Sequence, residues 1–265
     1  MPPLVDESVL SDGGIKVDQS GATLTITLAR PDSRNSQTPA TWRALSAVAT
    51  SLPSDVRIVV LRGEGKSFSA GLDKRMFAEG VDGELPLSGM ANLSDADFDG
   101  AIAGFQHAFT CWRDLDAIVI AAVQGHAIGA GFQLALGADL IVVANDVQFS
   151  MKETQLGLVP DLGGTQPLVA AVGYPTALEM CASGRWIGAQ EAVSSGIAVA
   201  NVEVGELDEE VARLSEGFLS GLPEAVSETK HLLSGALART RGEQCAAERK
   251  AQRRRIAHLS SLMGG

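Results

Sequence analysis

The chain has 265 residues, a formal net charge of −11 and three cysteines. The acidic balance argues against a general nucleic-acid-binding protein, because such proteins carry a basic surface. The widely spaced cysteines form no metal-ligand pattern and fit a reducing compartment. We see neither a secretory signal nor an apolar run of the roughly 18 residues that span a membrane. We therefore expect a cytoplasmic protein with no metal site that binds neither nucleic acid nor a membrane.

The first hundred residues predict a short α/β unit after a polar segment, residues 1–13, that we expect to be loose. Alternating apolar residues and small-residue turns then predict a β-hairpin, a helix, a buried strand and a glycine-bearing turn, over 15–28, 39–52, 57–62 and 63–72 respectively. Residues 79–100 are acidic, lack a clear period and are expected to form a loop with room for one short helix.

The segment from Ile118 to Asp139 has the strongest pattern in the chain. Its apolar start, residues 118–123, predicts a buried strand, and the stretch GHAIGAG at 125–131 predicts a turn into a helix. Backbone N–H groups at such a turn are unpaired and can bind an anion or a carbonyl oxygen. A tight crossover without a ligand would give the same pattern. The dinucleotide-binding fingerprint does not fit, because Leu134 stands where its third glycine is required.

The second half of the chain changes from mixed to helical character. Two strands are predicted over 140–144 and 147–151, and a loop rich in Gly and Pro follows at 152–166 with Glu153 and Asp161. After residue 168 the pattern is almost entirely helical, and the three longest candidates cover 206–219, 223–237 and 244–262. The fold class expected from this order is α/β with a helical C-terminal part.

Four segments, in this order, carry a resemblance to a known family: SFSAGLD at 67–73, GHAIGAG at 125–131, GLVPDLGGTQ at 157–166 and WIGAQEA at 186–192. Together they resemble the crotonase superfamily, also called the enoyl-CoA hydratase/isomerase family, over roughly residues 14–260. The resemblance implies a ββα spiral core with two β-sheets over residues 14–200. It also implies a helical region over 201–265 that assembles the chain into homotrimers or hexamers.

The resemblance implies an acyl-CoA thioester as substrate, with coenzyme A as part of the substrate and no separate cofactor. By analogy, the backbone N–H groups of Ala70 and Ala130 form an oxyanion hole that binds the thioester oxygen. The substrate contacts that the resemblance implies lie in the two glycine-bearing turns, at Ser69, Ala70, Gly71, Leu72, Asp73, Gly129, Ala130 and Gly131.

The acid–base residues depart from the family's hydratase pattern. Hydratases of the family carry two glutamates twenty residues apart, and these positions hold Gln133 and Glu153 here. A glutamine amide can orient water, but it has no carboxylate to accept a proton. One carboxylate suffices to move a double bond, and the stretch ETQLG from Glu153 is similar to the catalytic loop of Δ3,Δ2-enoyl-CoA isomerases. We therefore predict an enoyl-CoA isomerase with Glu153 as the proton shuttle.

Three alternatives stay open. Asp161 matches the position of an acid in dienoyl-CoA isomerases and in the ring-opening isomerase of phenylacetyl-CoA breakdown. The protein could instead be an enoyl-CoA hydratase of fatty acid β-oxidation that uses Gln133 and Glu153, or an acyl-CoA-binding protein with little catalysis. The family's usual C-terminal ending, which contributes CoA contacts, does not follow the last predicted helix. A group of basic residues in that helix could contact the CoA phosphates instead, but a solvated helix face explains them better. This basic group consists of Arg249, Lys250, Arg253, Arg254 and Arg255.

Overall fold

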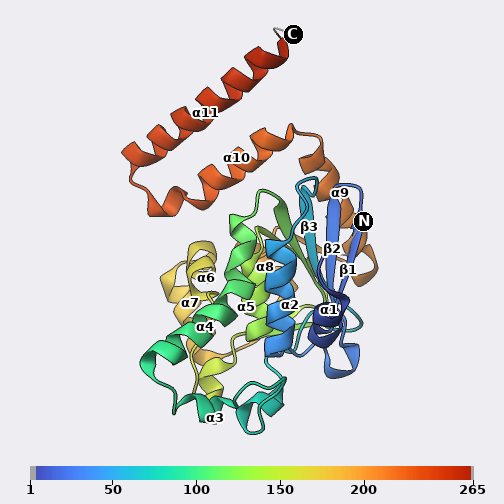
Figure 1. The fold of residues 1–265 in the computed structure, drawn as a ribbon, viewed down its shortest axis with the longest axis vertical. Helices are drawn as coiled ribbons and strands as arrows, with labels where there is room; N and C mark the ends of the chain where they lie inside the picture. The colour runs from blue at the N-terminus through green and yellow to red at the C-terminus, as the bar shows by residue number, and fades with distance from the viewer. Residues whose placement is uncertain (1–3, 264–265) are drawn as a thin grey trace.

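The computed structural model describes residues 4–263 and contains two β-sheets surrounded by helices (Figure 1). The large sheet has the strand order β1-β2-β3-β4-β6-β9, in which β1 and β2 form the predicted antiparallel hairpin and the other neighbours are parallel. Its strands are β1 Ile15–Ser20, β2 Thr23–Leu28, β3 Ile58–Gly63, β4 Ile118–Val123, β6 Leu140–Ala144 and β9 Ala200–Val202. The small sheet has the order β5-β7-β8, with β5 His126–Ile128, β7 Gln148–Ser150 and β8 Ile187–Gly188.

Eleven α-helices occur in the described part of the chain: α1 Glu7–Gly13, α2 Pro39–Thr50, α3 Leu87–Met90, α4 Asp95–Thr110, α5 Ala130–Gly137, α6 Thr165–Val172, α7 Tyr174–Ser183, α8 Ala189–Ser194, α9 Leu207–Leu219, α10 Pro223–Ser234 and α11 Arg241–Met263. Two short 3-10 helices matter for the site, η2 Lys74–Phe77 and η4 Glu153–Leu156. None of the described helices combines the length and apolar character needed to cross a membrane.

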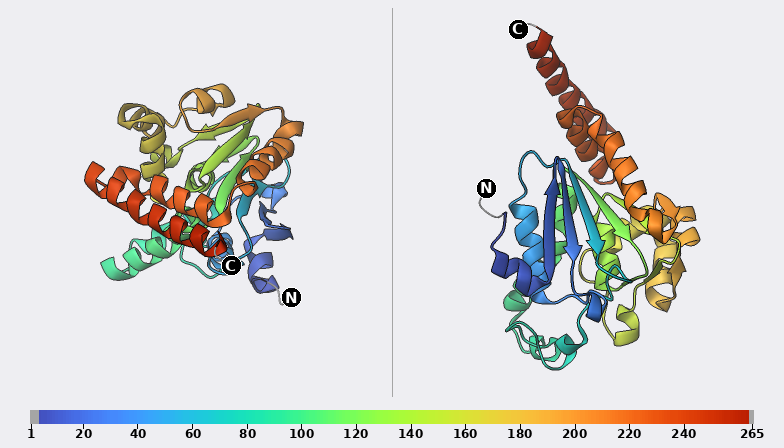
Figure 2. Two further views of the ribbon diagram at one scale, coloured as in Figure 1. Left: turned by 90° about the horizontal axis from the view of Figure 1, so that it is seen from above. Right: turned by 90° about the vertical axis from the view of Figure 1, so that its right-hand side faces the viewer.

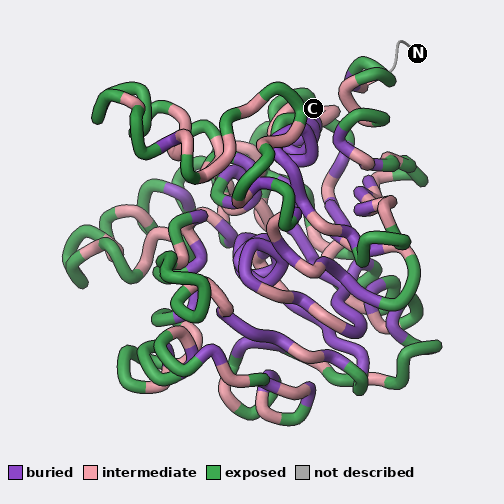
Figure 3. Tube along the Cα trace, turned by 90° about the horizontal axis from the view of Figure 1, so that it is seen from below, coloured by how far each residue is buried: buried purple, intermediate pink, exposed green. Residues whose placement is uncertain are grey.

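The large sheet is buried on both faces, which explains the unbroken apolar runs of its central strands. In β3, Val59 and Leu61 join the main core, whereas Ile58 and Val60 face a second cluster that α9 covers with Leu207. The buried residues therefore concentrate at the centre of the molecule (Figure 3).

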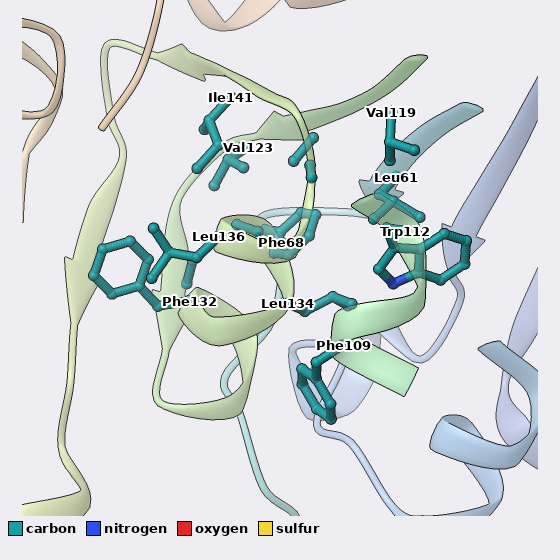
Figure 4. Packing of buried hydrophobic residues seen from close by; sticks show 14 of the residues in the cluster. Leu61, Phe68, Phe109, Trp112, Val119, Val123, Phe132, Leu134, Leu136 and Ile141 are labelled. Atoms are coloured by element: carbon teal, nitrogen blue, oxygen red, sulfur yellow. The ribbon is translucent and has the colours of Figure 1, made fainter. Parts of the chain in front are cut away.

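Helix α5 is buried along its whole length and lies inside the main core. Phe132, Leu134 and Leu136 extend from it into a cluster that also contains Phe109 and Trp112 (Figure 4). A helix that is buried on every side and apolar at nearly every position is typical of a fully enclosed site. The element that follows the second turn is therefore held rigidly by packing on all sides.

The prediction of a loose segment over residues 1–13 is wrong for residues 7–13, which form α1; residues 1–3 lie outside the described part. Asp6 caps this helix by accepting a hydrogen bond from the Ser8 amide at 2.8 Å. At its other end a Cβ added to Gly13 would lie 2.6 Å from Ala44 Cβ, so α1 packs closely on α2. This helix has no clear apolar pattern because it buries so few apolar side chains.

Three other elements differ from the sequence-based expectation. α4 begins at Asp95, inside the stretch expected to be a loop, with Ser94 as its N-cap. β8 and β9 interrupt the stretch predicted to be helical after residue 168; they have two and three residues, too few to show a period. The expected boundary at residue 200 falls inside β9, so the helical region that projects from the body begins only after α9.

α10 and α11 project from the body as an arm (Figures 1 and 2). Lys230 of α10 is buried and fixes the base of this arm: its Nζ donates to Ala117 O at 2.7 Å and pairs with Asp139 at 2.8 Å. Arg254 of α11 forms a two-pronged ion pair with Glu228 of α10. At least this member of the basic group is therefore engaged within the arm.

Candidate active site

The first turn, residues 67–73, is held in place by a network of buried polar side chains. The Ser69 hydroxyl donates to Asn35 O at 2.7 Å and accepts hydrogen bonds from Gln37 Nε2 and from the Gly71 amide, both at 3.1 Å. Trp42 Nε1 in turn donates to Gln37 Oε1 at 2.9 Å. The Ser69 hydroxyl thus makes three hydrogen bonds within the protein, and these hold the shape of the turn.

The loop before α2 contributes more to this turn than its sequence indicated. Asn35 is buried with a positive φ of 54°, and its side chain donates to Glu64 O at 2.9 Å and Ser67 O at 2.8 Å. Asparagine tolerates this left-handed conformation better than most residues, which explains its use here. The sequence showed only a polar loop, because a partner 32 positions away leaves no local pattern.

The second turn joins the first through a short stretch of parallel pairing. Ser69 N donates to His126 O at 2.9 Å, and Ile128 N donates to Ser69 O at 3.0 Å. At Gly71, with φ of 83°, an added Cβ would lie 2.3 Å from Ile128 O and 3.4 Å from Ala130 N. The backbones of the two turns are therefore in contact, and only glycine permits this approach at residue 71.

The free amides at this junction differ from the expected pair. Ala70 N donates to Arg34 O at 2.8 Å, so this amide is occupied. The amides of Leu72 and Ala130 have no hydrogen-bond acceptor within residues 4–263. Leu72 adjoins Gly71, whereas Ala130 is the first residue of α5, where an amide has no partner within the helix. The structure thus leaves the Leu72 amide, and not the Ala70 amide, free beside Ala130.

Glu153 begins η4 and places its carboxylate against the second turn. A Cβ added to Gly129 would lie 3.1 Å from Glu153 Oε1 and 3.8 Å from Oε2. Oε1 accepts a hydrogen bond from Gln133 Nε2 at 2.8 Å, whereas Oε2 is buried and has no partner among the described residues. Burial raises the pKa of Glu153; the backbone of Glu153 itself and the Gln133 hydrogen bond oppose this rise, and the negative charge of Asp161 adds to it.

Gln133 lies between Glu153 and the loop that precedes α6. Its Oε1 accepts from Leu162 N at 3.0 Å and from Gly164 N at 3.3 Å, while its Nε2 donates to Glu153. The twenty-residue spacing of 133 and 153 in sequence therefore corresponds to a direct contact.

Asp161 lies in the same loop, but its side chain is exposed. Partial burial by the surrounding protein nevertheless raises its pKa. Its backbone oxygen accepts from Gln106 Nε2 at 2.7 Å, which ties the loop to α4. Asp161 is near enough to affect the pKa of Glu153. Among the described residues, however, it forms no hydrogen bond with either turn.

Asp73, at the end of the first turn, serves the fold. It pairs with Arg75 at 2.8 Å and with Arg30 at 3.3 Å, and it caps η2 through the Arg75 amide. The Arg75 guanidinium, helped by Arg30, holds the pKa of this carboxyl well below its usual range. Within residues 4–263 no group of three or more His, Cys, Asp or Glu side chains could hold a metal ion.

Two converging turns, free amides and a buried carboxylate define a class of enzyme that stabilises charge on a carbonyl oxygen and moves a proton nearby. The enoyl-CoA hydratase/isomerase family model matches residues 18–264. The chain belongs to this family, as its four sequence segments indicated, and is an enzyme of the hydratase or isomerase type.

Individual relatives agree with this membership. The chain is 36% identical to the carnitinyl-CoA dehydratase of Escherichia coli K12 over 222 residues, which are 82% of this chain and 79% of the relative. It is similar to a provisionally assigned enoyl-CoA hydratase of Thermobifida fusca YX in complex with CoA, with 42% identity, a TM-score of 0.92 and coverage of 98% of this chain and 100% of the other. The acetoacetyl-CoA complex from the same organism gives 43% identity, a TM-score of 0.90 and coverage of 95% and 98%.

Proposed function

We propose that the protein is an enoyl-CoA isomerase that shifts a double bond in its substrate, with Glu153 as the proton shuttle. The observation that carries this proposal concerns Glu153, beside Gly129: among the described residues its buried Oε2 has no partner, and the amide of the adjoining Ala130 has no acceptor. A buried oxygen without a partner is unusual in a folded protein and is expected where a substrate supplies the partner.

In the proposed reaction the amides of Leu72 and Ala130 donate to the thioester oxygen. An enolate that forms there is stabilised by about 3–4 kcal/mol per donor, on the scale measured for other oxyanion holes. Glu153 takes a proton from the α-carbon and returns it to the γ-carbon, so the carboxylate ends in its starting state. Burial makes Glu153 a stronger base than an exposed glutamate.

The expectation of a CoA thioester as ligand is supported by the two complexes of the Thermobifida fusca relative, one with CoA and one with acetoacetyl-CoA. We extend this ligand class to the present chain and place the thioester group at the contact of the two turns. The proposal requires no separate cofactor.

Hydration or dehydration is the second candidate, and the 36% identity to a carnitinyl-CoA dehydratase favours it. Against it stands the bonding of Gln133: its oxygen is used by Leu162 and Gly164, and one N–H is used by Glu153. One N–H remains for a water molecule, but Gln133 has no carboxylate to take its proton, so Glu153 would be the single base and we expect slow hydration. Gln133→Glu should raise the rate of crotonyl-CoA hydration.

One experiment separates these functions. Butyryl-CoA is incubated with the enzyme in D2O, exchange at the α-carbon is followed by NMR, and crotonyl-CoA hydration is assayed in parallel. Exchange with little hydration supports the isomerase. Hydration as fast as in a two-glutamate hydratase would favour the second candidate, and activity in neither assay would indicate an acyl-CoA-binding protein.

We also propose that the arm of α10 and α11 takes part in a homotrimer or hexamer. Several apolar side chains on it are exposed in the single chain, among them Leu233, Ile256 and Leu259. Burial of such residues between subunits is a common source of association energy. Light scattering at micromolar concentration should report a trimer or hexamer, and a monomer would contradict this proposal.

A further inference from the structure

Gln133 is the only polar side chain of α5, and it is 1% exposed. All its neighbours along the helix are buried apolar residues or glycine. A buried amide without partners is costly, so each end of this amide is expected to be bonded and fixed in place. Both of its ends are indeed bonded to the protein.

The orientation of the Gln133 amide follows from its partners. Two backbone N–H groups, from Leu162 and Gly164, point at one end of the amide, so this end must be the oxygen. The other end is then the NH2 group, which donates to Glu153 Oε1. Gly164 also packs tightly on the side chain, because a Cβ there would lie 2.7 Å from Gln133 Cγ. The amide therefore has one orientation available.

This fixed donor makes the two oxygens of Glu153 unequal. Oε1 is held by Gln133, whereas Oε2 is buried and has no partner within residues 4–263. We propose, on the basis of the function proposed above, that Gln133 is a positioning residue: it holds Oε1 and leaves Oε2 as the oxygen that exchanges the proton with the substrate. A glutamine suits this task because it donates at any pH and cannot compete for the transferred proton.

Few other charged groups act on Glu153. Asp161, in the loop before α6, adds a negative charge that raises the pKa of Glu153. Burial raises the pKa of the Cys181 thiol in α7, and the nearby charge of Glu153 raises it further, so the thiol stays neutral. The hydrogen bond from Gln133 is the side-chain interaction that opposes the rise in the pKa of Glu153. Loss of that bond should therefore move the ionisation of Glu153 to higher pH.

The test is the pH dependence of α-proton exchange from butyryl-CoA, measured together with the Kd of acetoacetyl-CoA. Gln133→Met removes the donor at similar volume. We expect exchange at the optimum to fall roughly 10- to 100-fold, as for a misplaced catalytic group, with the Kd unchanged within a few-fold. We also expect the acidic limb of the profile to move to higher pH. An unmoved limb would overturn the proposal.

Two further variants separate positioning from support of the loop. Gln106→Met is the matched control, because Gln106 also anchors this loop, through Asp161 O, without touching Glu153. Its acidic limb should stay in place, and a shift equal to that of Gln133→Met would mean that loop support explains both. Gln133→Glu keeps an acceptor for Leu162 N and Gly164 N, so it preserves the fold if Gln133→Met does not.

In Gln133→Glu, two carboxyl groups in contact should titrate as a coupled pair, so the limb should resolve into two ionisations. A single unshifted ionisation would contradict the proposed contact. Failure of the underlying function has a different signature: Glu153→Gln would then leave exchange unchanged. If Glu153→Gln abolishes exchange while the Gln133 variants keep the wild-type profile, only the positioning role is lost.

Discussion

The two turns that meet at the site are held in different ways. In the first turn the buried polar groups are paired within the protein, as in the hydrogen bonds of Ser69 with Asn35 and Gln37. Beside the second turn one buried oxygen, Oε2 of Glu153, has no described partner. Since folded proteins pair nearly all buried polar groups, the difference separates a supporting turn from a reacting one.

The largest expected effect is the loss of activity when Glu153, beside the second turn, is replaced. Glu153→Gln keeps the size and the hydrogen bonding of the side chain but removes the base. Isomerisation of a 3-enoyl-CoA should fall by about 100-fold or more, while the Kd of acetoacetyl-CoA stays within a few-fold. Steady-state kinetics and calorimetry measure the two quantities.

Asp161→Asn is the matched comparison, since it removes the nearby exposed carboxylate and leaves the fold contacts in place. We expect isomerisation to stay within about 10-fold of wild type, well short of the loss of a general base. Activity that survives Glu153→Gln but is lost in Asp161→Asn would make Asp161 the base and favour the ring-isomerase relationship.

A smaller effect, on stability, is expected when the buried hydrogen-bond network of the first turn is broken. Ser69→Ala leaves Gln37 Nε2 and the Gly71 amide without their acceptor, which should lower the free energy of unfolding by roughly 1–3 kcal/mol. The exposed Ser33→Ala is the control and should stay within about 0.5 kcal/mol. Urea denaturation measures both, and equal values would remove the distinction between the buried network and the surface.

The smallest expected effect is the pH dependence of stability. The pKa of Glu153 is higher in the folded than in the unfolded chain, so the stability that this group contributes is present below its unfolded pKa and is lost as the pH rises through the folded pKa. Glu153→Gln should therefore be more stable than wild type at neutral pH, and this advantage should vanish near pH 4. Thermal melts at the two pH values test the sign, and an advantage that grows in acid would contradict it.

The sequence predicted the parts of the fold that have a period or a family motif. The hairpin at β1 and β2, the buried strands β3, β4 and β6, and the long helices were recognisable from their apolar spacing. β5, β8 and β9 were missed because β5 lies within the glycine-bearing turn, and β8 and β9 lie in a stretch whose pattern is otherwise helical. Residues 7–13 were missed because α1 is held by its cap and by the close packing of Gly13, features that composition does not reveal.

The candidate site could be predicted only to the level of its segments. The spacing of Gln133 and Glu153 identified a pair that the structure brings to 2.8 Å. The sequence could not identify the free amide, because Ala70 and Leu72 lie in the same motif. Only the hydrogen bond from Ala70 to Arg34, 36 positions earlier along the chain, distinguishes them. Long-range backbone contacts of this kind have no local signature.

A crystal structure of the acetoacetyl-CoA complex would show which amides and which carboxylate meet the substrate. We expect the thioester oxygen to lie about 2.7–3.1 Å from both Leu72 N and Ala130 N, with Glu153 Oε2 the carboxylate oxygen nearest the α-carbon. We also expect Ala70 to keep its bond to Arg34. A thioester oxygen bound by a released Ala70 amide, or an α-carbon next to Asp161 instead of Glu153, would contradict this assignment of the site.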